Sequence, residues 1–255
     1  MIEVRQTLSA KDRLILALDT STFEQALKFV DQLSEYVGVF KIGLELFVNT
    51  GLSLMEELHQ RGLKVFFDGN FLDIPDAVAR ESHQLALKGV DMFTLDASGG
   101  RAMLEASVQA CQSTARQMGK NPPASLGMTV LTSLNQDALQ NELHVVSTMA
   151  DQVLRLGQLC QACGLSGVVT SAQELPQLRS VLGSGMLYVT PGVRPVWAEA
   201  NDHTRVVTPA EAIANGSDYL VIGRPITRAK DPCDAAKRIL FEMDSELSQT
   251  RAGSF

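Results

Sequence analysis

Short apolar segments alternate with longer amphipathic segments along the chain. The apolar segments are four to seven residues long and rich in β-branched residues, which is typical of buried β-strands. In the longer segments the apolar residues recur at helical spacing, which predicts amphipathic helices. The expected strands are 13–19, 38–42, 64–68, 91–95, 125–130, 166–170, 187–190 and 218–222, and the clearest expected helices are 22–35, 74–88, 100–118, 145–163 and 208–215.

This alternation predicts an α/β fold with a parallel sheet. Eight strand-helix units in 255 residues match the size of a closed (β/α)8 barrel, the TIM barrel. The alternative is an open, doubly wound sheet, but its first strand normally leads into a G-x-G-x-x-G turn. Here the first strand ends in Asp19-Thr20-Ser21, and a helix capped by Ser or Thr follows.

No long linker rich in Pro, Gly or Ser divides the chain. We therefore expect a single domain over residues 1–255, with its core at about 13–240. The polar segment at about 248–255 is expected to be a frayed tail.

The composition excludes several classes of protein. With 45% hydrophobic and 20% charged residues, the chain is expected to fold into a globular domain. Its net charge is −7 and Lys and Arg do not cluster, so we expect neither a nucleic-acid partner nor a membrane surface. A small anionic substrate remains compatible with a few focused cations. No apolar stretch approaches about 18 residues and no signal peptide is visible, so we expect a cytoplasmic protein.

The cysteine pattern indicates structural thiols. The chain has four cysteines, and Cys160 and Cys163 form a C-x-x-C motif that could be a redox pair or half of a zinc site. The motif lies in a helix-like segment, where this spacing places both thiols on one apolar face. Because no second C-x-x-C or Cys/His pair accompanies it, we expect buried structural cysteines and no metal site.

Polar residues recur at the carboxyl ends of the expected strands, where barrel enzymes carry their chemistry. Each one alone has a structural explanation, such as a helix N-cap or a turn glycine. Their shared position at the end of successive strands indicates a functional site. The set comprises Asp19, Lys41, Asp68, Asn70, Asp73, Asp96, Thr132, Ser133, Ser171, Pro191, Gly192, Arg194, Gly223 and Arg224.

The end of the last strand predicts a phosphate site. In YLVIGRPIT, Gly223 enters a turn and Pro225 starts a short helix, an arrangement that presents backbone N–H groups. Arg224 adds a guanidinium suited to phosphate oxygens, and the preceding loop, TPGVRP, adds Arg194. Phosphate sites built from these two loops are common in such barrels.

From about residue 13 to 240 the chain resembles the orotidine 5′-phosphate decarboxylase family. The matching segments are LALD (16–19), FKIGLELF (40–47), FFDGNFLDIPDAV (66–78), ASGG (97–100), VLTSL (130–134), TSAQE (170–174), TPGVRP (190–195), RVVTPAEAI (205–213) and SDYLVIGRPIT (217–227). The resemblance implies a dimeric TIM barrel that uses neither metal nor organic cofactor. It also implies binding of a pyrimidine nucleoside monophosphate and removal of the C6 carboxylate of orotate.

The resemblance further implies roles for individual residues. Asp19 and Lys41 would contact the ribose, Asp68 would lie against the substrate carboxylate, and Thr132 and Ser133 would contact the base and ribose. Asp73 and Ile74 would reach the partner subunit's site. The phosphate would be bound by Arg194, Gly223 and Arg224 beside Pro191. Phosphate and ribose contacts far from the reacting carbon would offset the strain of bringing like charges together.

One departure from the family pattern concerns the reaction itself. The third-strand motif of the family is Asp-x-Lys-x-x-Asp-Ile, and this chain has Asn70 in place of the lysine. In the family, that lysine donates a proton to the carbanion at C6 and stabilises its charge. Losing a general acid costs about 10²–10⁴ in rate, and losing electrostatic stabilisation costs a comparable or larger factor. We therefore expect impaired decarboxylation.

The same substitution changes the charge of the site. Lys41, Asp68, Asn70 and Asp73 together carry −1, whereas the family's set is neutral. This predicts weaker binding of a carboxylated base than of a neutral one.

Three further positions depart from the family. Asp96 stands where the family often has His, Asp76 where it usually has Asn, and His203 where a lid Gln closes on phosphate.

Two other functions remain open. One is a catalytically silent nucleotide-binding homologue. The other is a lyase or hydrolase acting on a different ribosyl or sugar phosphate, which in related barrels usually needs a metal.

Overall fold

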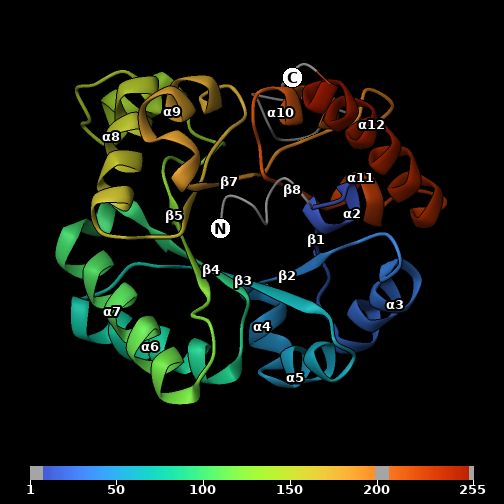
Figure 1. Cartoon of the computed structure of the whole chain (residues 1–255), viewed down its shortest axis with the longest axis horizontal. Coiled ribbons are helices and arrows are strands. Elements are labelled where there is room, and N and C mark those ends of the chain that lie inside the picture. Colours follow the sequence, from blue (N-terminus) through green and yellow to red (C-terminus); the bar gives the residue numbers. More distant parts are fainter. Residues whose placement is uncertain (1–7, 199–206, 253–255) are drawn as a thin grey trace.

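The computed structural model describes residues 8–198 and 207–252, and its parallel strands close into a barrel in sequence order (Figure 1). The strands are β1 (Leu14–Ala17), β2 (Val39–Gly43), β3 (Lys64–Phe71), β4 (Met92–Asp96), β5 (Ala124–Met128), β6 (Gly167–Val169), β7 (Leu187–Thr190) and β8 (Tyr219–Ile222). Each overlaps a strand expected from the sequence. The (β/α)8 barrel is therefore confirmed.

Helices surround the barrel on its outside (Figure 1). They are α2 (Ala10–Arg13), α3 (Phe23–Leu33), α4 (Leu44–Thr50), α5 (Ser53–Gln60), α6 (Pro75–Lys88), α7 (Gly100–Met118), α8 (Met149–Ala162), α9 (Leu175–Leu182), α10 (Pro209–Ala214), α11 (Arg224–Thr227) and α12 (Pro232–Ala252). None of those in the described part of the chain is long and apolar enough to cross a membrane.

Two helix boundaries differ from expectation. Helix α8 begins at Met149 rather than near residue 145, because the Thr148 side chain caps it by accepting the Asp151 backbone N–H at 3.1 Å. Helix α12 continues to Ala252, so the polar composition after about residue 248 does not end the helix there. Both differences arise at helix ends, where side-chain capping and packing decide the boundary.

Strand alternation separates two apolar cores. On β1, Ile15 and Ala17 pack inside the barrel with residues such as Phe66, whereas Leu14 and Leu16 pack against the helices. Inward positions are two residues apart on every strand, because successive side chains of a strand point to opposite faces. Continuing the inward row of each strand toward its carboxyl end leads to the polar residues of the candidate site.

The C-x-x-C motif belongs to the packing between α8 and the barrel. Cys160 and Cys163 are buried free thiols, and burial raises the pKa of Cys160 to about 12. A Cβ atom on Gly127 of β5 would lie 2.2 Å from the Cys160 Sγ, so this thiol sits directly against the strand backbone. The expectation that both thiols of this pair are buried is confirmed.

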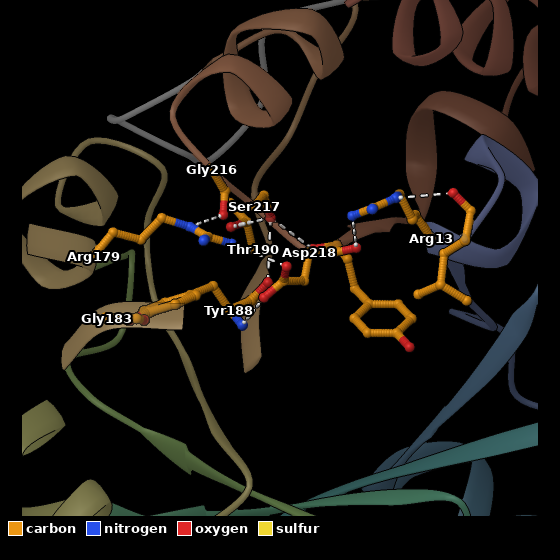
Figure 2. A network of polar contacts seen from close by, with 10 residues as sticks. Arg13, Arg179, Gly183, Tyr188, Thr190, Gly216, Ser217 and Asp218 are labelled. Atoms are coloured by element: carbon orange, nitrogen blue, oxygen red, sulfur yellow. Dashed lines mark hydrogen bonds and ion pairs between the residues drawn. The ribbon is translucent and has the colours of Figure 1, made fainter. Parts of the chain in front are cut away.

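Asp218, just before β8, connects several elements at the amino-terminal end of the barrel (Figure 2). It is 4% exposed, and its Oδ1 and Oδ2 atoms accept hydrogen bonds from Arg179 Nη2 and the Tyr188 backbone N–H, both at 2.9 Å. Its backbone carbonyl accepts a 3.2 Å bond from Arg13 Nη1. One buried carboxylate thus links α9, β7 and β8, and its backbone joins them to the start of β1.

We expect Asp218→Ala to lower the free energy of unfolding by about 2–4 kcal/mol, because it removes one acceptor of the half-buried Arg179 guanidinium and leaves a buried N–H without its acceptor. Urea unfolding followed by circular dichroism measures this loss. Glu105→Gln is the matched control, since Glu105 pairs with Arg101 on an exposed helix face, where such pairs contribute about 0–1 kcal/mol. Equal losses in the two variants would contradict the role given to Asp218.

Helix α6 carries a partly buried carboxylate that, unlike that of Asp218, has an oxygen without a hydrogen-bond donor in the described part of the chain. The Oε2 atom of Glu81 is buried and has no hydrogen-bond partner among the described residues. Burial raises the pKa of the Glu81 carboxyl, and the negative charge of Asp73 raises it further. The folded protein therefore holds a proton at Glu81 to higher pH than the unfolded chain does.

Glu81 should consequently make the protein less stable as pH rises above the ordinary range of a glutamate, because the folded state then binds more protons than the unfolded state. We expect Glu81→Gln to have the same free energy of unfolding as the unchanged protein at about pH 4 and a higher one at about pH 7. Urea unfolding at both pH values tests this, with Glu105→Gln as control. A stability difference that does not vary with pH would contradict it.

Candidate active site

A cavity of about 200 Å³ opens at the carboxyl ends of the strands. Eight residues singled out in the sequence line it: Asp19, Lys41, Asp68, Pro191, Gly192, Arg194, Gly223 and Arg224. Its floor is formed by interior barrel residues that include Phe66, Met128, Val169 and Val221. Its lining has three cationic and two anionic side chains, so the cavity carries a formal charge of +1 in a chain of −7. This focused positive charge suits an anionic ligand.

An ion pair forms part of the cavity lining. Lys41 Nζ lies 3.0 Å from Asp68 Oδ2, and the side chains are 13% and 21% exposed. The other oxygen of Asp68 accepts a 2.9 Å hydrogen bond from the hydroxyl group of Thr94. Both carboxylate oxygens therefore have a donor supplied by the barrel interior.

Strand β3 is distorted just beyond Asp68. Between Phe67 and Phe71 the pairing with β4 shifts register, and Asn70 adopts a left-handed conformation with φ of 46°. A Cβ atom on Gly69 would lie 2.6 Å from the ring of Phe67, so a side chain at this position would clash. Among non-glycine residues, Asn tolerates the left-handed region best, and a bulge of this kind redirects the side chains that follow it.

Because of this bulge, Asn70 is not among the residues that line the cavity. Its backbone N–H donates a 2.8 Å hydrogen bond to the Thr94 hydroxyl oxygen, and its side-chain Oδ1 is buried without a partner among the described residues. The backbone of Asn70 thus supports Asp68 through Thr94.

The loops after β7 and β8 contribute residues to the same cavity. Arg194 is 4% exposed, and a bridge between Val193 and Val207 closes the base of its loop. Gly223 precedes α11, and a Cβ atom there would lie 2.5 Å from Asp19 Oδ2. A larger residue at this position would therefore have to displace the Asp19 side chain from the place where these two strand ends approach each other. Two guanidinium groups and a close-approach glycine at strand ends are features of phosphate-binding barrels.

Besides Asn70, six predicted site residues lie away from the cavity lining, and one cannot be placed; the six are Asp73, Ile74, Asp96, Thr132, Ser133 and Ser171. Asp73 and Ile74 are exposed on the segment after β3, where Asp73 Oδ1 accepts the Ile74 backbone N–H at 2.6 Å. Thr132 is half-buried and Ser133 exposed on the loop after β5. His203 lies outside the described residues.

Two departures from the family pattern have local structural roles. Asp96 Oδ1 accepts the backbone N–H of Ser98 at 2.8 Å and so caps the turn after β4. Asp76 pairs with Arg80 on the exposed face of α6.

In the described ranges 8–198 and 207–252, no group of three or more His, Cys, Asp or Glu side chains could hold a metal ion.

Sequence reasoning did not identify Thr94. This residue is 0% exposed in the middle of β4 and bonds to Asp68 from the neighbouring strand. The sequence contains a signal for it, because Met92 packs in the barrel interior and residue 94 shares its inward orientation.

Comparisons with known proteins agree with this geometry. Residues 12–239 match the "Orotidine 5'-phosphate decarboxylase / HUMPS family". Orotidine 5′-phosphate decarboxylase of Heliobacterium modesticaldum is 41% identical over 242 residues, which cover 95% of this chain and 100% of the relative. The enzyme of the same name from Moorella thermoacetica is 43% identical over 237 residues, covering 93% of this chain and 94% of the relative.

Solved structures give the same result. The crystal structure of orotidine 5′-phosphate decarboxylase from Lactobacillus acidophilus matches with a TM-score of 0.80 and 35% identity, over 91% of this chain and 98% of that one. An uncharacterized conserved protein from Geobacillus kaustophilus matches with a TM-score of 0.78 and 31% identity, over 90% and 99% of the two chains. The chain therefore belongs to the orotidine 5′-phosphate decarboxylase / HUMPS family.

Proposed function

We propose that the chain binds a pyrimidine nucleoside monophosphate in the described cavity and that Asn70 impairs its activity as an orotidine 5′-phosphate decarboxylase. One observation carries the proposal. Arg194, Arg224 and the Lys41–Asp68 pair line one and the same cavity, while Asn70 is absent from its lining. The binding groups expected of the family are present, and the family's proton donor is not.

The cavity offers complementary groups for the parts of such a nucleotide. Arg194, Arg224 and the backbone at Gly223 would hold the phosphate by charge-assisted hydrogen bonds. Asp19 and Lys41 would contact the ribose hydroxyls. The base would then lie over the apolar floor, with its C6 atom toward Asp68.

The chemistry explains why position 70 matters. In decarboxylation the bond between C6 and the carboxylate breaks, carbon dioxide leaves, and the electron pair on C6 takes up a proton. An asparagine amide is too weakly acidic to supply that proton. Lys41 is the one ammonium group among the described residues lining the cavity, and its partner at 3.0 Å is Asp68. Lys41 therefore balances Asp68, and no second ammonium stabilises the developing carbanion.

The charge around Asp68 favours a neutral base over a carboxylated one. The carboxylate of orotidine 5′-phosphate would lie against Asp68, and like charges at short distance repel each other. Uridine 5′-phosphate, the decarboxylation product, lacks that carboxylate. We therefore propose tighter binding of the product than of the substrate.

An exposed apolar surface supports the dimer that the resemblance implies. Leu44, Val48, Leu72 and Ile74, near the carboxyl ends of β2 and β3, are between 51% and 80% exposed. Asp73 lies within this surface and does not line the cavity of its own chain. We propose that a second copy of the chain covers this surface and receives Asp73 in its cavity.

Uridine 5′-phosphate and orotidine 5′-phosphate together test the proposed nucleotide binding and the proposed impairment of decarboxylation. We expect uridine 5′-phosphate to bind in isothermal titration calorimetry, and Arg224→Ala to weaken it about tenfold or more through loss of a charge-assisted contact. We also expect ultraviolet absorbance to show turnover of orotidine 5′-phosphate far below the ordinary enzymatic rate of about 10 per second. Ordinary turnover would disprove the impairment, and absence of nucleotide binding would disprove the site. Binding without any turnover would identify a silent nucleotide-binding homologue.

Restoring the lysine should restore chemistry. We expect Asn70→Lys to raise the turnover of orotidine 5′-phosphate by about 10² or more, since it returns a general acid and a positive charge. We also expect a stability loss of about 1 kcal/mol, because lysine fits the left-handed conformation less well than asparagine. Asn121→Lys, on an exposed loop, is the control for added charge. No gain in turnover would show that other departures limit the reaction.

The proposed interface is tested by placing charge in it. We expect Ile74→Asp to shift the protein from dimer toward monomer in sedimentation velocity, because it buries an unpaired carboxylate. Val181→Asp provides the comparison, since Val181 is also exposed but lies on α9. A monomeric parent protein, or an unchanged dimer in Ile74→Asp, would contradict this interface.

A further inference from the structure

The Thr94 hydroxyl has two hydrogen-bond partners and one consistent orientation. It accepts the Asn70 backbone N–H at 2.8 Å and lies 2.9 Å from Asp68 Oδ1. Because Asn70 occupies a lone pair of the oxygen and an ionised carboxylate can only accept, the hydroxyl proton must point toward Asp68. Thr94 is 0% exposed, so water does not compete for either bond.

Without Thr94, one oxygen of Asp68 would have no donor among the described hydrogen bonds and ion pairs. Lys41 contacts only Oδ2, and rotation about the last side-chain bond of aspartate is soft. A second donor on the neighbouring strand fixes the plane of the carboxylate. Both supports come from the rigid barrel interior, which holds a functional group more closely than loops do.

We infer that Thr94 is a positioning residue that holds the Asp68 carboxylate toward the C6 side of the bound base and thereby sets the preference between neutral and carboxylated pyrimidine nucleotides. The inference rests on the proposed nucleotide site. It adds a determinant of specificity that does not itself touch the ligand. It also links the left-handed turn at Asn70 to the orientation of Asp68, because the Asn70 N–H fixes the direction of the Thr94 proton.

The decisive variant is Thr94→Val, which keeps the shape of the side chain and removes the hydroxyl. Asp68 can then rotate away from an incoming carboxylate. We expect the dissociation constant of orotidine 5′-phosphate, divided by that of uridine 5′-phosphate, to fall about tenfold, the effect of one hydrogen bond to a charged group. Thr94→Ser keeps the hydroxyl and should leave this ratio within about twofold of the parent.

If Thr94 had a purely structural role, its replacement would not change this ratio, because a loss of stability weakens the binding of both nucleotides alike. Thr114→Val is the matched control: Thr114 is also buried, but its hydroxyl bonds to His83 between α6 and α7. We expect this control to lower thermal stability without changing the ratio. An unchanged ratio in Thr94→Val, or equal changes in the Val and Ser variants, would overturn the inference.

A measurement without nucleotide separates this inference from the proposed function. In crystal structures of the ligand-free variants, we expect the Asp68 carboxylate to rotate in Thr94→Val and to keep its position in Thr94→Ser. An unmoved Asp68 in Thr94→Val would overturn the positioning role even if nucleotides bind. A rotated Asp68 in a protein that binds no pyrimidine nucleotide would support the positioning role and reject the nucleotide site.

Discussion

Closure of eight parallel strands into a barrel is the constraint on which the rest of this structure depends. Closure makes every second side chain of each strand point inward, and at the carboxyl ends the inward rows finish in polar residues. Lys41, Asp68 and Thr94 come from three strands that pair side by side, so their inward side chains meet within hydrogen-bond distance. The same closure brings Gly223 of the last unit against Asp19 of the first.

The end of β3 shows how one substitution and the local backbone fit together. Asn70 occupies a left-handed position in a bulge, which asparagine tolerates and lysine tolerates less well. The bulge turns the Asn70 backbone toward Thr94, so this position contributes to the orientation of Asp68 rather than to the cavity lining. The backbone of this position therefore supports the neighbouring carboxylate through Thr94.

The amino-terminal end of the barrel serves stability instead. There Asp218 satisfies a guanidinium and a backbone N–H from elements far apart in sequence, and no ligand is needed to explain its burial. The site end differs, because the Lys41–Asp68 pair lies open to a cavity. This division of roles follows the general rule for barrels, in which loops after the strands carry function and the opposite end carries stability.

Much of the fold and part of the site could be predicted from local patterns. Apolar runs marked the eight strands, and polar residues at their ends marked Asp19, Lys41, Asp68, Arg194 and Arg224, all of which line one cavity. Counting inward positions along β4 from Met92 would also have found Thr94. The bulge at Asn70 was harder to predict, because it depends on the ring of Phe67 and on the register with β4.

The sequence by itself determined the barrel, the family and the chemical types of side chain at the strand ends, since periodicity and motif spacing are local properties of a chain. Only the tertiary structure decided which of these groups meet. Thr94 bonds to Asp68 across 26 positions of sequence, and Arg179 to Asp218 across 39. Such contacts form when neighbouring strands pair, because the pairing register sets distances that the linear order leaves open.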